Sequence, residues 1–266
     1  MKITLQIDKS VEQNAEEYYQ RAATAKKKIG GAKRMVEKAK QELDSTEEKE
    51  VSFTIHLDKR RKKWYESYHW CHTKNNYLCI GGRDASSNEA VIKKHLEKGD
   101  LVYHTDAPGS PFVVLKNGQE AEDVDRKNAA MLAGLYSKAW KSGLGEIEVM
   151  EVFPDQVTKE TQSGEYISTG SFMIYGDRNM IRVPLDLGIG IRRIEDDILL
   201  MAGPLDCVKQ HCKAWIELEQ GAQSKGDISN HTMKILNIAR NDSILTRLPS
   251  GTFRIEDRYT EELKDI

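Results

Sequence analysis

The sequence contains no apolar run of roughly 18 residues, the length that a membrane-spanning helix requires, and its N-terminus has no apolar signal stretch. Only four of its 266 residues are cysteine, too few for a disulfide scaffold in a chain of this length. Charge of one sign is also lacking, since 40 Lys and Arg against 42 Asp and Glu leave a net charge of −2. We therefore expect a cytoplasmic protein without a membrane partner, in which charge has to be examined segment by segment.

Residues 1–50 are expected to form a helical coiled-coil arm. Ser10 and Gln13 have the spacing of a capping box, which places the helix start near Val11. Arg21–Lys40 carries eight basic residues and one acid. Small and apolar residues recur at alternating spacings of four and three, the pattern of a heptad seam: Tyr18, Ala22, Ala25, Ile29, Ala32, Val36, Ala39 and Leu43. The seam favours pairing of the helix, within the molecule or with a second copy, over docking on its own domain.

The remaining chain is expected to hold an α+β domain over residues 51–179 and a C-terminal α/β extension over 180–266. Strands are predicted at Val51–Leu57, Tyr77–Ile80, Leu101–Thr105, Phe112–Leu115, Ile147–Phe153, Tyr166–Tyr175, Met180–Ile191, Ile198–Ala202 and Ala214–Leu218. Helices are predicted at 86–99, Asp123–Lys141, Leu205–Cys212 and Lys225–Ala239. The fold class is α+β, with a mixed sheet packed against helices and preceded by the helical arm.

Positive charge is concentrated in one run, Lys59-Arg60-Arg61-Lys62-Lys63, which Trp64 follows directly. Adjacent cations attract phosphates, and aromatic faces can stack on unpaired bases. The alternative is a solvated linker followed by core aromatics, because Trp64, Tyr68 and Trp70 would share one face of a strand.

A second candidate is the glycine turn Gly82-Arg83-Asp84-Ala85, which runs from a strand into a helix start. Ser86 and Glu89 have capping-box spacing there. Free N–H groups and the helix dipole favour an anion, which Arg83 could clamp. In the alternative interpretation the glycine only makes the turn, and Arg83 pairs with Asp84 or Glu89.

The third candidate is His104 with Asp106, on one face at the end of a predicted strand. The two side chains could serve acid–base chemistry or hold a metal, or they could simply orient the following loop. The other His and Cys clusters lack a fourth ligand or converging geometry, so no metal site is expected. No catalytic motif is specific enough to assign a catalytic residue.

Taken together in their order, several blocks of the sequence resemble the NFACT family, the NEMF- and RqcH-like ribosome quality-control factors. The blocks are Lys63-Trp64-Tyr65-Glu66, His69-Trp70, Gly82-Arg83-Asp84-Ala85, Asn88-Glu89, His104 with Asp106, Ser137-Lys138-Ala139-Trp140, Gln156-Val157-Thr158-Lys159 and the stretch Ser163–Phe172. The tail blocks Ala202-Gly203-Pro204 and Leu248-Pro249-Ser250-Gly251 are similar to the archaeal branch. A full-length member also carries an NFACT-N domain and a helix–hairpin–helix segment, so the resemblance covers the C-terminal half of the family pattern.

The resemblance implies a non-enzymatic RNA-binding module that needs no cofactor and binds large-subunit rRNA and tRNA on ribosomes with stalled nascent chains. Its candidate RNA- and phosphate-binding residues are Lys59, Arg60, Arg61, Lys62, Lys63, Trp64, Arg83, His104 and Lys159. Two alternatives are a nucleic-acid-processing enzyme that uses His104 and Asp106, and a coiled-coil protein-interaction module that uses the seam. Salt-dependent RNA binding without turnover would distinguish the RNA-binding module from the enzyme. Binding that ignores salt and is lost with the seam would favour the interaction module.

Overall fold

The computed structural model describes residues 4–6, 8–44, 54–57, 62–107, 109–160, 167–260 and 263; within 8–44 the side chains of 23, 27, 31, 32, 34 and 37–44 are left out. The chain divides into two compact units, Met1–Ser52 and Phe53–Ile266, and each is described by itself. Among the described helices, none combines the length and the hydropathy needed to cross a membrane.

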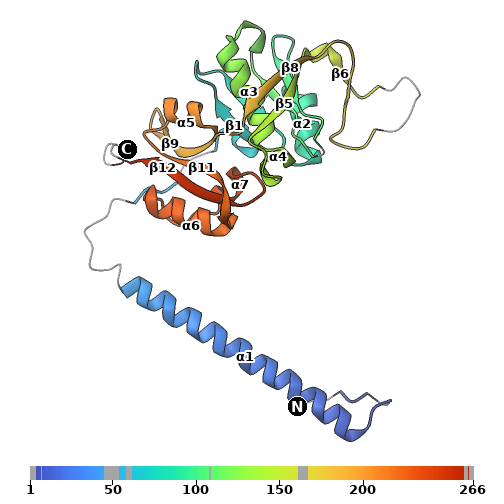
Figure 1. Ribbon diagram of the computed structural model, residues 1–266, viewed down its shortest axis with the longest axis vertical. Helices are drawn as coiled ribbons and strands as arrows, with labels where there is room; N and C mark the ends of the chain where they lie inside the picture. The colour runs from blue at the N-terminus through green and yellow to red at the C-terminus, as the bar shows by residue number, and fades with distance from the viewer. Residues whose placement is uncertain are drawn as a thin grey trace. The chain divides into compact units, whose positions relative to one another are not determined.

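The N-terminal unit contains one long helix, α1 (Val11–Asp44), which confirms the predicted helix start (Figure 1). The capping box also forms as expected: Ser10 Oγ accepts from the N–H of Gln13 at 3.3 Å, and Gln13 Oε1 accepts from the N–H of Ser10 at 3.0 Å. The helix continues through Gly30 without a break. The pairing of this helix into a coiled coil stays a prediction.

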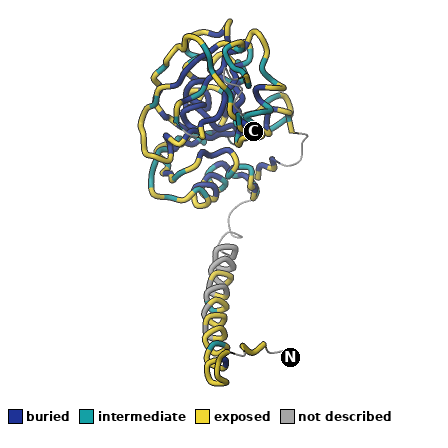
Figure 2. The backbone as a smooth tube through the Cα atoms, turned by 90° about the vertical axis from the view of Figure 1, so that its right-hand side faces the viewer, coloured by how far each residue is buried: buried dark blue, intermediate teal, exposed yellow. Residues whose placement is uncertain are grey.

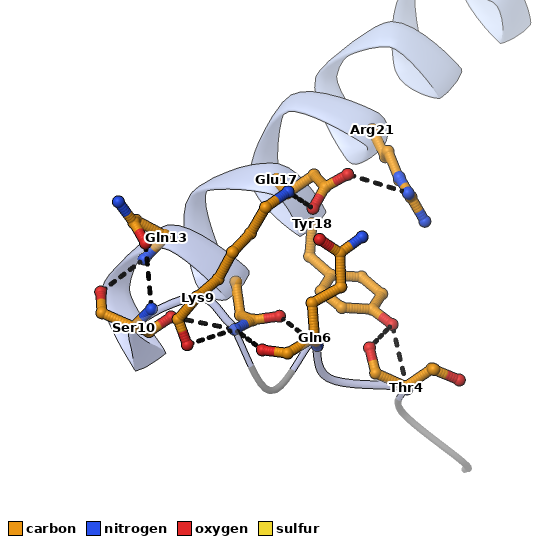
Figure 3. Close-up of polar contacts among 9 residues, drawn as sticks. Thr4, Gln6, Lys9, Ser10, Gln13, Glu17, Tyr18 and Arg21 are labelled. Carbon is orange, nitrogen blue, oxygen red and sulfur yellow. Dashed lines mark hydrogen bonds and ion pairs between the residues drawn. The ribbon is translucent and has the colours of Figure 1, made fainter.

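The residues that precede α1 fold back along its first turns (Figure 3). The Tyr18 hydroxyl donates to the carbonyl of Thr4 at 2.8 Å and accepts from the N–H of Thr4 at 3.1 Å. The amide of Asn14, only 5 % exposed, accepts from the N–H of Gln6 and donates to three carbonyls of residues 6–10. Tyr18, the first residue of the predicted seam, is therefore engaged locally.

In the second unit, a six-stranded sheet forms the first layer of the fold. Its strands in spatial order are β1 (His69–His72), β2 (Leu78–Gly81), β4 (Val113–Leu115), β3 (Leu101–His104), β5 (Glu146–Val152) and β8 (Asn179–Pro184). Helix α3 (Asp123–Leu135) packs on this sheet and also contacts the second sheet. Small residues allow that close approach, since a Cβ on Gly134 would lie 2.7 Å from Ile147 Cγ2.

A four-stranded sheet forms the C-terminal part of the same unit (Figure 1). Its strands in spatial order are β10 (Asp197–Pro204), β9 (Leu187–Ile194), β11 (Ala214–Gln223) and β12 (Phe253–Tyr259), and its helices are α5 (Leu205–His211), α6 (Lys225–Ile235) and α7 (Ser243–Arg247). The remaining elements are the 3-10 turns η1 (Trp64–Ser67), η2 (Gly118–Glu120) and η3 (Pro154–Gln156), helices α2 (Ala85–His95) and α4 (Lys138–Lys141), and the pair β6 (Val157–Thr158) and β7 (Met173–Ile174).

Two hydrophobic clusters form the core of this unit, and Figure 2 shows its buried interior. Trp70 and Tyr103 belong to the first cluster, and Trp140 and Phe253 to the second; each is buried. In the first half of β11, buried and half-buried residues alternate, which matches a strand with one face toward this core.

The α+β class is confirmed, but the expected mixed sheet is wrong, because every pair of neighbouring strands among the described elements is antiparallel. The strand predicted at Met180–Ile191 is two strands, β8 and β9, and the chain crosses between the sheets at this point. β8 joins the first sheet, so that sheet includes residues expected in the C-terminal extension.

The single helix predicted over Asp123–Lys141 is also wrong, because α3 ends at Leu135 and α4 follows. Ser137 causes the break: its hydroxyl donates to the carbonyl of Gly134 at 2.7 Å and accepts from the N–H of Ala139 at 3.1 Å.

Two predicted strands are much shorter in the structure. Of Val51–Leu57, only Ile55 forms a bridge, parallel to Ile238, and residues 51–53 lie outside the described residues. Of Tyr166–Tyr175, only β7 is a strand, and Tyr166 also lies outside the description. Helix α7 and strand β12 were not predicted, although both contribute to the second sheet and its surroundings.

Candidate nucleic-acid interface

Segments far apart in the sequence meet around one cavity of about 470 Å³. They are the start of β1, the turn before α2, the end of β3, the loop before β4, Tyr136 after α3, and the loop before β7. The lining residues are His69, Gly82, Arg83, Asp84, Ala85, Asn88, His104, Gly109, Ser110, Pro111, Phe112, Tyr136, Thr169, Gly170, Ser171 and Phe172. Two of the sequence candidates, Arg83 and His104, therefore belong to one site.

The helix start at this cavity differs from the prediction. Asp84, not Ser86, is the N-cap of α2, and its carboxylate accepts from the N–H of Ser87 at 2.8 Å. Hydrogen bonds from Ser87, and from the backbone of Ser86, lower the pKa of Asp84. The capping carboxylate thus already occupies donors that an anion was expected to use, and anion binding depends on side chains instead.

Gly82 fits this turn because Asn88 lies directly beneath it: a Cβ on Gly82 would lie 2.6 Å from the backbone nitrogen of Asn88. The side chain of Asn88 in turn accepts from the N–H of Phe112 at 3.0 Å. This bond connects the start of α2 to the loop that forms the opposite wall of the cavity.

Glu89 fixes another wall of the cavity. Its carboxylate contacts Lys159 Nζ at 2.8 Å and Lys93 Nζ at 2.6 Å, and it accepts from the N–H of Gly170 at 2.8 Å. These partners hold the pKa of Glu89 at about 2. The Lys159 ammonium also lies 4.5 Å from the centre of the Phe172 ring. In this structure Lys159 therefore holds the loop before β7 in place.

Arg83 lies between three cavities and lines all of them. Its Nη2 donates to the carbonyl of Thr246 at 3.1 Å, its Nε is buried without a hydrogen-bond partner, and no described carboxylate lies within ion-pair distance. Burial lowers the pKa of Arg83. The alternative in which Arg83 forms an ion pair with Asp84 or Glu89 is not what the structure shows.

Lys225 is a second cation at this site, and sequence analysis did not single it out. It is half-buried at the start of α6 and lines a cavity of about 330 Å³ together with Arg83 and His69. Its pKa is lowered by burial and by the charge of Arg83. Because Lys225 lies more than a hundred positions from Arg83 in the sequence, no local motif could have indicated the pair.

His104 lies at the cavity wall without a catalytic partner. Its ring stacks on Phe112 with centroids 4.1 Å apart, and its Nδ1 lies 3.0 Å from the carbonyl oxygen of Pro111. Because a carbonyl only accepts, the neutral ring carries its proton on Nδ1 and leaves Nε2 as an acceptor. Burial lowers the pKa of His104. Asp106 is exposed, and no hydrogen bond is described between it and His104, although its charge acts to raise the pKa of His104 against the effect of burial.

The cation run is only partly described. Lys59, Arg60 and Arg61 lie outside the described residues. Lys62 is exposed and lines a third cavity of about 630 Å³, which it shares with Arg83. Lys63 is half-buried, and its N–H donates to Glu66 at 2.7 Å.

The aromatic residues after the run divide between the surface and the core. Trp64 is 51 % exposed and stacks on His95 with centroids 4.4 Å apart, whereas Tyr68 and Trp70 are buried. Because Trp64 lies in η1, it does not share a strand face with the other two. Only Trp64 among these three offers ring surface to solvent.

Metal and thiol chemistry find no support among the described residues. No group of three His, Cys, Asp or Glu in the described part of the chain could hold a metal ion. All four cysteines are buried and free, and burial raises the pKa of the Cys212 thiol. The fold and the cavity define the class of the protein, an α+β domain with a polar cavity beside which two cations, Arg83 and Lys225, lie together.

Comparison with known proteins identifies the family. The model of the NFACT protein RNA binding domain matches residues 67–176. The archaeal Rqc2 homolog aRqcH of Methanocaldococcus jannaschii is 34 % identical over 197 residues, which cover 73 % of this chain and 29 % of that protein. The human ribosome quality control complex subunit NEMF is 36 % identical over 177 residues, 63 % of this chain and 16 % of that protein. The chain belongs to the NFACT family and contains its NFACT-R domain.

The chain spans less than a third of the length of these two curated relatives. A solved structure, the C-terminal part of the fibronectin/fibrinogen-binding protein from Streptococcus suis, is 18 % identical, with a TM-score of 0.39 over 65 % of this chain and 76 % of that one.

Proposed function

We propose that this chain is the RNA-binding module of a cytoplasmic, archaeal-type ribosome quality-control factor. Its partners are large-subunit rRNA and tRNA on ribosomes that carry stalled nascent chains, and it performs no catalysis. The matched RNA-binding domain and the names of the relatives support this proposal. The observation that carries it is that Arg83 and Lys225 line one cavity and that neither forms an ion pair with a described carboxylate, in a chain whose net charge is −2.

Phosphate contacts extend in this proposal from Arg83 to the cation run at 59–63. Lys62 lines a cavity that also contains Arg83 and Arg240, so the described end of the run lies on a surface with other cations. Asp58 and Glu66 are the only acids that flank the run in the sequence, and Glu66 pairs with Arg247 at 3.7 Å. Five adjacent cations outnumber these two flanking acids, and in this proposal the excess charge displaces counterions from an RNA backbone.

The test is a triple variant in which Lys59, Arg61 and Lys63 become glutamine. Its affinity for tRNA and for large ribosomal subunits should fall, and the slope of log affinity against log salt should flatten by about 0.7 to 0.9 for each phosphate that the variant no longer neutralises. The melting temperature should change little, because exposed ion pairs contribute under about 1 kcal/mol. A matched variant neutralises three exposed lysines elsewhere: Lys74, Lys94 and Lys127.

Equal affinity and equal salt slope in the two triple variants would contradict a role of the run in RNA binding. A large drop in melting temperature for the first variant would show that the run has a structural role instead. Co-sedimentation of the wild-type chain with ribosomes, with and without a stalled nascent chain, tests the proposed partner directly. Turnover of the bound RNA would favour the enzyme hypothesis.

A further inference from the structure

The cavity of about 330 Å³ around Arg83 is lined by residues from two parts of the α+β unit. Arg83 and His69 come from the NFACT-R part, whereas Lys225 and the loop at Leu248–Ser250 come from the C-terminal part. No Asp or Glu is among the described residues that line this cavity. The C-terminal part therefore completes a cationic cavity that the NFACT-R part alone would leave open.

Among the described residues, no carboxylate forms an ion pair with either cation, although the charge of Asp84 acts on Arg83. Lys225 forms no ion pair with any described carboxylate, and Arg83 only donates to a backbone carbonyl. Asp84, the nearest acid to Arg83 in sequence, uses its carboxylate to cap α2. A third arginine nearby, Arg247, differs from these two because it pairs with Glu66 and donates to backbone carbonyls.

His69 indicates the sign of the electrostatic field at the base of this cavity. Its pKa is lowered by burial and further by the charges of Arg83, Arg247 and Lys225. Its ring stacks on Tyr136 with centroids 3.7 Å apart, so both rings are held in place. Arg83 and Lys225, which form no ion pair with a described carboxylate, therefore add positive charge beside a neutral histidine, and this charge favours an anionic ligand.

We propose that Arg83 and Lys225 clamp the phosphate of one unpaired ribonucleotide, whose base enters the adjoining 470 Å³ cavity beside His104. This inference rests on the proposed RNA-binding function and names the part of the RNA that the site recognises. The two cavities share Arg83, His69, Gly109 and Tyr136, so one ligand can span both.

The size and chemistry of the two cavities fit a single nucleotide rather than a helix. Their volumes lie in the range of roughly 300–1,000 Å³ that is typical of small-ligand pockets. A base flipped out of an RNA strand is recognised by hydrogen bonds to its edge and by stacking. His104 supplies an acceptor at Nε2, and the buried Phe112 ring, stacked on His104 and in edge contact with Phe172, holds the histidine ring in place at the cavity wall. A duplex, whose bases are stacked inside, presents no such group.

The first experiment uses uridine 5′-monophosphate, uridine and orthophosphate, measured by equilibrium dialysis against the full chain. Uridine 5′-monophosphate should bind more tightly than either uridine or orthophosphate. Lys225→Gln should weaken that binding about tenfold, the effect of losing one charge-assisted hydrogen bond. Lys225→Arg should restore it. The matched control is Lys234→Gln, an exposed lysine on the same helix and outside the cavities.

Equal binding by Lys225→Gln and Lys234→Gln would overturn the proposal, and so would equal binding of the nucleotide and uridine. Orthophosphate that binds as tightly as the nucleotide would identify a site for free phosphate and would also overturn it. If Lys225→Gln melts at a lower temperature, the Lys225→Arg variant decides, because it should fold and bind like the wild type.

The second experiment separates this inference from the proposed function. Fluorescence anisotropy compares a single-stranded oligouridylate with a duplex of the same length. Lys225→Gln should weaken the single strand selectively, whereas the triple variant of the cation run should weaken both. A wild-type chain that binds neither RNA overturns the proposed function. A chain that binds both equally, with Lys225→Gln unchanged, overturns only the inference drawn from the cavity.

Discussion

Helix α1 and the α+β unit differ in how far their apolar side chains are buried. In α1, Ile29 is 57 % exposed and Val36 55 % exposed, although both lie on the predicted seam. In the α+β unit, Ile80 and Ile189 are completely buried, and the largest side chains lie in two clusters. Isolated helices gain little stability from propensity alone, and most comes from packing of an apolar face. The comparison teaches that α1 presents an apolar stripe which the described contacts of its own unit do not cover.

The described side-chain contacts of α1 gather at its beginning. Asn14 and Tyr18 hold the preceding residues, and Glu17 contacts both Lys9 and Arg21 at 3.2 and 3.0 Å (Figure 3). Exposed pairs of this kind contribute a few tenths of a kcal/mol each. Farther along the helix, the seam residues Ile29 and Val36 are exposed, and pairing with another helix would bury them.

The largest effect is the expected difference in unfolding free energy between two isoleucine-to-alanine substitutions, one in each region. Ile80→Ala removes fully buried methyl groups from the core and should lower the free energy of unfolding by about 2–5 kcal/mol. Ile29→Ala removes exposed atoms, and in dilute monomeric protein it should change that free energy by less than about 0.5 kcal/mol. Urea unfolding followed by tryptophan fluorescence measures the first, and circular dichroism follows α1. Equal effects of the two substitutions would show that the comparison is wrong.

Many of the helices and strands were predicted from the sequence, and the incorrect predictions have physical reasons. The start of α1 was predictable because a capping box is a local signal, read from Ser10 and Gln13 alone. The break after α3 was missed because the helical period continues through it, and only the hydrogen bonds of Ser137 show that the helix ends. The division of 180–191 into two strands was missed because a crossing between sheets depends on tertiary packing.

The candidate site likewise contains residues that the sequence indicated and one that it did not. Arg83 and His104 were found in short motifs, because a glycine turn before a helix and a histidine at a strand end are local patterns. Lys225 was not found, since only the packing of the second sheet brings α6 to Arg83. The capping residue of α2 was misassigned by two positions because Asp84 and Ser86 are both good N-caps, and the sequence offers no criterion that separates them.

A second prediction tests whether the seam of α1 has a partner. Ile29→Asp would place a charge at the centre of the Tyr18-to-Leu43 stripe. If two helices pair through this stripe, the buried carboxylate should destabilise the pair by about 1–3 kcal/mol and shift a concentration-dependent equilibrium toward the single chain. Sedimentation equilibrium over a range of concentrations measures the shift. Lys33→Asp, an exposed position on the same helix, is the matched control.

Unchanged mass, helicity and melting in Ile29→Asp relative to Lys33→Asp would show that the stripe has no partner. The apolar residues of the stripe would then stay exposed to solvent, and α1 would differ from the α+β unit in lacking a packed apolar face.

The smallest effect is expected at the loop that Glu89 holds in the α+β unit. Lys159, Lys93 and the N–H of Gly170 lower the pKa of Glu89 from its ordinary value of 4.5 to about 2. Because the folded pKa is the lower one, this carboxylate stabilises the fold above pH 4.5 and loses that contribution as the pH falls toward 2. Glu89→Gln should therefore melt at a lower temperature than the wild type near neutral pH, and this difference should shrink as the pH falls from about 4.5 toward about 2. Glu120→Gln, at an exposed position, is the matched control, and the pH dependence of melting measures both.

An identical pH profile for the two variants would mean that the ion pairs of Glu89 do not stabilise the loop before β7. The walls of the cavity would then depend on its aromatic contacts and on the bond between Asn88 and Phe112, rather than on charge.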